Sequence, residues 1–60
     1  MSNILRKREV QKRVGLSDPS IWRLEKAGQF PKRIVLSKSA VGWLESEIND
    51  WIEARAQARG

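Results

Sequence analysis

The feature that most constrains this chain is the turn Gly15-Leu16-Ser17, which separates two short segments with helical spacing. Before the turn, Val10 and Val14 stand four residues apart, as they would on one face of a helix. Gly15 suits the left-handed position that follows a helix C-terminus, and Ser17 is a residue type that often begins a new helix. The pattern therefore predicts two helices joined by a three-residue turn, which is the spacing of a helix-turn-helix.

The second predicted helix begins after Ser17, whose hydroxyl is expected to accept a hydrogen bond from the amide of Ser20. Asp18 and Pro19 occupy the first turn, where an acid and a proline are tolerated, and the helix is expected to end at Gly28. Three-residue spacing puts one set of its side chains inward and another outward: Ile21, Leu24 and Ala27 inward, and Trp22, Arg23 and Lys26 at least partly outward.

From residue 31 the pattern changes to the two-residue period of a strand. Ile34 and Leu36 fall on one face, and Arg33, Val35 and Ser37 on the other. The segment 37–39 then separates this run from a second alternating run at 40–43. These features predict a two-stranded hairpin directly after the second helix, with basic side chains at Lys32, Arg33 and Lys38, which is the placement of a wing.

A third helix is predicted over residues 45–60, where Ile48, Trp51 and Ile52 follow helical spacing, with acids in the first turn and arginines in the last. Trp43 and Trp51 both fall on inward positions, so we expect them to be core residues. The expected fold is mainly α with a small β-hairpin: a winged helix-turn-helix of three helices plus a two-stranded wing, in one domain spanning 1–60.

Composition narrows the function. The chain has 12 Lys and Arg against 7 Asp and Glu, a formal charge of +5, and neither cysteine nor histidine. Disulfides, thiol nucleophiles, zinc-finger ligation and imidazole acid–base catalysis are therefore excluded, and we expect no enzyme, cofactor or metal. The acids of the third helix are interpreted as complementing its dipole. No apolar run approaches a membrane span and the start does not look like a secretory signal, so a soluble, intracellular protein is expected.

A strongly basic chain favours a polyanionic partner, and the helix-turn-helix with a basic hairpin makes double-stranded DNA the expected one. The outward side of the second helix would enter a major groove, where Arg23 has the reach for a base edge or a phosphate, while the wing meets the adjacent backbone. Two roles stay open: Trp22 faces either DNA or the core, and Asp18 either complements the helix N-terminus or accepts from a cytosine. The candidate DNA-binding residues are Ser17, Ser20, Trp22, Arg23, Lys26, Lys32, Arg33 and Lys38.

The same stretches resemble the AlpA-type phage regulators, winged-helix relatives of MerR-type DNA-binding domains and excisionases. The matching segments are "REVQKRVGLS", "SIWRLEKAGQFPKRIVLS" and, most specifically, "AVGWLESEINDWI". The resemblance implies a small bacterial or prophage transcription factor that switches on neighbouring prophage genes. It places Ser17, Ser20, Trp22 and Arg23 in the recognition helix and Lys32, Arg33 and Lys38 in or near the wing. The chain departs from the family pattern at Asp18-Pro19 and in a wing tip without glycine.

Two other functions remain open at this stage. An excisionase-like protein would use the same fold to bend DNA and recruit an integrase, and a protein-interaction adaptor would dock its third helix on a partner. Further partners of the leading hypothesis are RNA polymerase or an integrase. We expect a monomer that binds paired sites cooperatively through small contacts between neighbours, because the third helix uses its apolar stripe on its own core.

Overall fold

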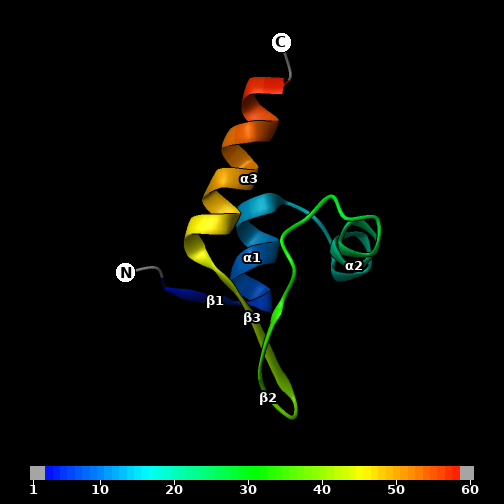
Figure 1. Ribbon diagram of the computed structural model, residues 1–60, viewed down its shortest axis with the longest axis vertical. Helices are drawn as coiled ribbons and strands as arrows, with labels where there is room; N and C mark the ends of the chain where they lie inside the picture. The colour runs from blue at the N-terminus through cyan, green and yellow to red at the C-terminus, as the bar shows by residue number, and fades with distance from the viewer. Residues whose placement is uncertain (1–2, 59–60) are drawn as a thin grey trace.

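The computed structural model of the chain describes residues 3–58. Its elements follow in the order β1 (Ile4–Arg6), α1 (Lys7–Val14), α2 (Asp18–Lys26), β2 (Ile34–Ser37), β3 (Ala40–Leu44) and α3 (Glu45–Ala58). In Figure 1, α1 occupies the middle, α3 extends from it at one end, the β2–β3 hairpin projects at the other end, and α2 stands to one side. Three helices with a small antiparallel β element confirm the predicted winged helix-turn-helix class.

The turn between α1 and α2 has the predicted backbone but not the predicted cap. Gly15 adopts φ 71°, and its amide donates to the Gln11 carbonyl at 2.8 Å, which closes α1. Ser17 holds the N-cap position of α2 with extended backbone, yet its side chain makes no cap hydrogen bond. The expected bond to the Ser20 amide is therefore wrong, because the Ser17 hydroxyl instead donates to the Ser20 hydroxyl at 3.1 Å.

The sheet contains a strand that the sequence did not reveal. β1 pairs antiparallel with β3, which lies in the middle of the order β1-β3-β2, so the wing is a hairpin rooted in a three-stranded sheet. Gly42 permits this close pairing. A Cβ at this position would lie 2.5 Å from Ile4 Cγ2 and 3.0 Å from the Leu5 carbonyl oxygen, so a side chain there would push the strands apart.

The core lies between the inner face of the sheet and the helices. Its buried side chains are Leu5, Val10, Ile21, Phe30, Trp43 and Ile48. Trp43 is fully buried, as expected, whereas Trp51 is half-buried at the edge of this cluster, against Phe30 at a centroid distance of 4.9 Å. The three-residue spacing predicts Ala27 on the inward face, which is wrong: Ala27 is exposed because α2 ends at Lys26 and Ala27 is its C-cap residue.

The hairpin alternates as the sequence predicts. Ile34 lies opposite Gly42, and Leu36 Cδ1 lies 3.2 Å from the position that a Gly42 Cβ would take, so Ile34 and Leu36 share the outer face of the sheet. Val35 is 72% exposed, and the hairpin that carries it projects beyond the helices (Figure 1). Within residues 3–58 no helix has the length and apolar character that crossing a membrane requires.

Candidate nucleic-acid interface

The outward face of α2 carries an aromatic ring and two cations. Trp22 is 51% exposed, and Arg23 and Lys26 are also exposed, while Ile21 on the opposite face is fully buried. Trp22 therefore lies on the surface, which removes the alternative that it is a core residue. Lys26 Nζ lies 4.9 Å from the centroid of the Trp22 ring, one helical turn away, so a cation–π contact holds the two side chains together.

The N-terminal end of α2 is tied to the start of α1. Asp18 Oδ2 pairs with Lys7 Nζ at 3.4 Å, and both side chains remain partly exposed. The other carboxylate oxygen, Oδ1, is buried without a hydrogen-bond partner in residues 3–58. The acid that departs from the family pattern is therefore directed toward a lysine of the neighbouring helix. Ser17 and Ser20 lie at this same end of α2, exposed and half-buried respectively.

The segment between α2 and β2 is fixed by two indole groups. Trp43 Nε1 donates to the Pro31 carbonyl at 3.0 Å, and Trp51 Nε1 donates to the Gln29 carbonyl at 2.8 Å. Phe30 between these carbonyls is buried, with 6% of its surface exposed. The backbone on both sides of Phe30 is thus held by buried or half-buried tryptophans. Lys32, which follows Pro31, therefore starts from a fixed backbone position.

Arg33 is half-buried and paired with Glu25 of α2. Its guanidinium donates to both Glu25 carboxylate oxygens, with NH2 to Oε2 at 2.8 Å and Nε to Oε1 at 3.1 Å, and it lies 5.1 Å from the Trp43 ring centroid. The hydrogen bond to Glu25 raises the pKa of Arg33 above its ordinary value. The pair joins α2 to the base of the wing. Arg33 therefore helps to fix how the wing is placed beside α2. A direct DNA contact by Arg33 stays a prediction.

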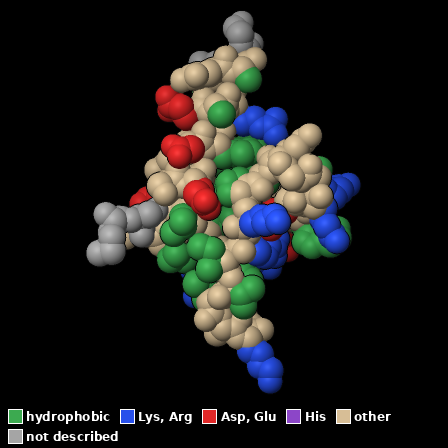
Figure 2. Space-filling view, viewed as in Figure 1, with side chains coloured by type: hydrophobic (Ala, Val, Ile, Leu, Met, Phe, Trp, Pro, Cys, Tyr) green, Lys and Arg blue, Asp and Glu red, His purple; other side chains and the backbone are tan. Residues whose placement is uncertain are grey.

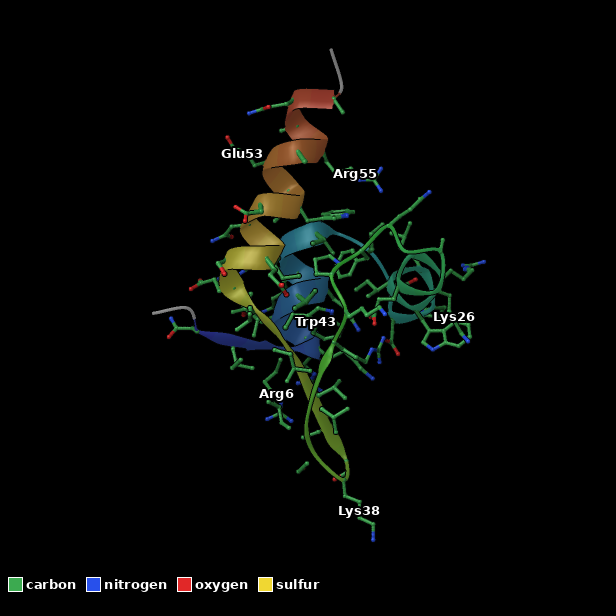
Figure 3. All side chains as sticks on the ribbon, in the orientation of Figure 1. Arg6, Lys26, Lys38, Trp43, Glu53 and Arg55 are labelled. Atoms are coloured by element: carbon green, nitrogen blue, oxygen red, sulfur yellow. The ribbon has the colours of Figure 1, made fainter. Side chains whose placement is uncertain are left out.

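The wing tip carries Lys38, which points away from the body of the molecule (Figure 3). Nearer the wing root, a hollow is lined on one side by Arg6, Lys7 and Arg8 and on the other by residues 39–41 of the hairpin. This basic run was not among the predicted site residues. The sequence shows three consecutive cations here, but it does not show that they lie beside the wing. Their position depends on β1, whose pairing with β3 places Arg6 opposite Gly42.

Charge is distributed unevenly over the molecule. In Figure 2, acidic side chains gather along α3, and Lys and Arg side chains lie over α2 and at the wing tip. The exposed acids of α3 include Glu47, Asp50 and Glu53. On α1, the Arg13 guanidinium pairs with Glu9 at 3.1 Å and with Glu45 at 3.0 Å, and the hydrogen bond that it donates to Glu9 is the main reason that the pKa of Arg13 is raised. The surface formed by α2 and the wing is thus left with uncompensated cations.

Residues 3–56 match the sequence pattern of a protein family described as the prophage CP4-57 regulatory protein, AlpA. The chain belongs to the AlpA family. The expected resemblance is confirmed, and the family's description is that of a prophage regulatory protein. A relative in Enterobacteria phage P4, named "Uncharacterized protein ORF88", is 38% identical over 55 residues. The match covers 92% of this AlpA-family chain and 62% of the phage protein, so the chain spans less than two thirds of that relative.

Proposed function

We propose that the chain is a sequence-specific DNA-binding transcriptional regulator of prophage or mobile-element genes. In this proposal α2 lies in the major groove and the wing follows the adjacent backbone. The supporting observation is the outward face of α2, where Trp22, Arg23 and Lys26 are exposed next to a basic wing. The acidic side chains, in contrast, either lie on α3 or form ion pairs with cations of α1 and the wing base.

The side chains divide into two roles. Within residues 3–58 Arg23 forms no ion pair, so its planar fork is available for a guanine edge or a phosphate. Lys26, Lys32 and Lys38 suit phosphates, because an ammonium on a flexible stem carries charge without base-reading geometry. The hydroxyls of Ser17 and Ser20 at the N-terminal end of α2 add neutral contacts to the backbone.

The proposal includes cooperative assembly on DNA. A single DNA-binding module buries roughly 600–1,000 Å² of protein surface, which seldom gives high specificity by itself. We therefore infer that the free chain is a monomer and that copies on repeated or inverted sites contact one another. RNA polymerase or an integrase is the proposed protein partner beside the DNA, in a bacterial cytoplasmic, nucleoid-associated setting.

Selection of DNA fragments from a random pool tests the proposal. The purified chain should enrich one recurrent motif, and its affinity for that motif should fall steeply with salt, because neutralised phosphates release counterions. A bending assay on the same motif distinguishes the excisionase-like alternative, which requires a strong bend. Enrichment of no motif, with salt-insensitive binding to a protein instead, would contradict the proposal and favour an adaptor.

A further inference from the structure

A hollow lies between the C-terminal part of α2 and the segment that leads into β2. Its lining residues are Trp22, Glu25, Lys26, Gly28, Lys32 and Arg33. The Glu25 carboxylate and the Arg33 guanidinium neutralise each other through their paired hydrogen bonds, with only 11% and 23% of the two side chains exposed. The charge left in the hollow is therefore that of two lysine ammonium groups.

The walls of the hollow are held in place before any ligand arrives. Glu25 and Arg33 join α2 to the wing base, and the indoles of Trp43 and Trp51 bind the carbonyls just before Lys32. Gly28 adopts φ 73°, and no atom lies within 4 Å of the position that its Cβ would take, so one side of the hollow is open backbone. A ligand can approach there closely without displacing a side chain.

The donors of the hollow are all suited to one kind of acceptor. Within residues 3–58 the indole N–H groups of Trp43 and Trp51 are hydrogen-bonded to carbonyls, whereas that of Trp22 has no such bond. Lys26 is held over the Trp22 ring, and Lys32 comes from the fixed segment opposite. An indole N–H and two ammonium groups donate and do not accept, which matches the acceptor-only oxygens of a phosphodiester.

We propose that this hollow seats a single backbone phosphate of the bound DNA, with Trp22, Lys26 and Lys32 as its donors. The inference rests on the proposed function and adds a specific site to it. The Trp22 ring is then a positioning group for Lys26 as well as a donor. The seat fixes the register of α2 on the duplex, since one phosphate is held between the recognition helix and the base of the wing.

The test uses the selected duplex with one phosphate at a time replaced by an uncharged methylphosphonate. On unmodified DNA, Lys32→Ala should weaken binding roughly tenfold and Trp22→Phe, which keeps an aromatic face for Lys26 but lacks the N–H, roughly threefold to fivefold. A methylphosphonate at one position of the duplex should weaken binding by the parent chain. With that modified duplex, the affinities of both variants should lie close to that of the parent.

Lys38→Ala is the matched control, because Lys38 lies at the wing tip (Figure 3) and does not line the hollow. The affinity lost through Lys38→Ala should add in full to the affinity lost through the methylphosphonate at the position shared by Lys32 and Trp22. A methylphosphonate at a different position should remove the effect of Lys38→Ala. The seat is refuted if Lys32→Ala and Trp22→Phe couple to different phosphates or to none, or if Trp22→Phe binds as tightly as the parent. Failure of the proposed function has another signature, since the parent chain would then show no preference for the selected duplex.

Discussion

Replacing Trp43 tests whether one side chain supports both the core and the segment between α2 and β2, which we propose faces DNA. Trp43 is fully buried, packs edge-on against Phe30 and donates its indole N–H to the Pro31 carbonyl. Trp43→Ala should cost about 3–5 kcal/mol, the usual range for removing a large buried aromatic side chain. A chain of 60 residues has a total stability of only about 3–9 kcal/mol, so this variant should be largely unfolded at 37 °C.

A smaller change keeps the experiment quantitative. Trp43→Phe retains a ring but leaves the Pro31 carbonyl without its donor, and we expect a loss of about 1–3 kcal/mol, measured by urea unfolding followed by circular dichroism. Trp22→Ala is the matched control, because that side chain is 51% exposed and its loss should cost less than about 1 kcal/mol. If Trp43→Ala melts within a few degrees of the parent, or Trp22→Ala is as damaging as Trp43→Phe, the assigned core is wrong.

Four variants separate base reading, phosphate contact and architecture. Arg23→Ala should reduce the binding free energy by about 1–3 kcal/mol through one base pair of the selected site, and equal losses on every sequence would make Arg23 a backbone contact. Lys38→Ala should weaken binding to all sequences alike and reduce the slope of log affinity against log salt by about one. Glu25→Ala should destabilise the fold by about 1–3 kcal/mol in urea unfolding, because Arg33 loses its partner in a largely covered position; an unchanged midpoint would show that the pair contributes nothing. Gly42→Ala should cost about 1–3 kcal/mol through overpacking against β1, and stability equal to that of the parent would contradict the strand pairing.

Much of the fold follows from local sequence signals. Gly15 marks the end of α1 because a left-handed backbone there suits glycine, and the three-residue spacing of Ile21 and Leu24 orients α2 without knowledge of the rest of the chain. The same reasoning placed Trp43 inward and the basic wing after α2. The outward face of α2 was therefore predictable from the sequence.

Two features that the sequence pattern does not indicate depend on residues elsewhere in the chain. β1 has three residues, too few to show a two-residue period, and it exists because β3 offers it a ladder. Arg33 was read as a wing cation, whereas its guanidinium is taken up by Glu25, eight residues earlier in the chain. Neither contact leaves a trace in spacing or composition, and both required the tertiary structure.

DNA binding through α2 and the wing is tested by NMR of the ¹⁵N-labelled chain with the selected duplex. The indole N–H groups of Trp22, Trp43 and Trp51 report separately on the exposed face of α2 and on the two indole–carbonyl bonds that fix the segment between α2 and β2. On titration, the Trp22 indole signal and the backbone amides of α2 and the wing tip should shift, while the Trp43 indole and the acidic face of α3 stay unchanged. Shifts confined to α3, with the Trp22 indole unmoved, would contradict the account.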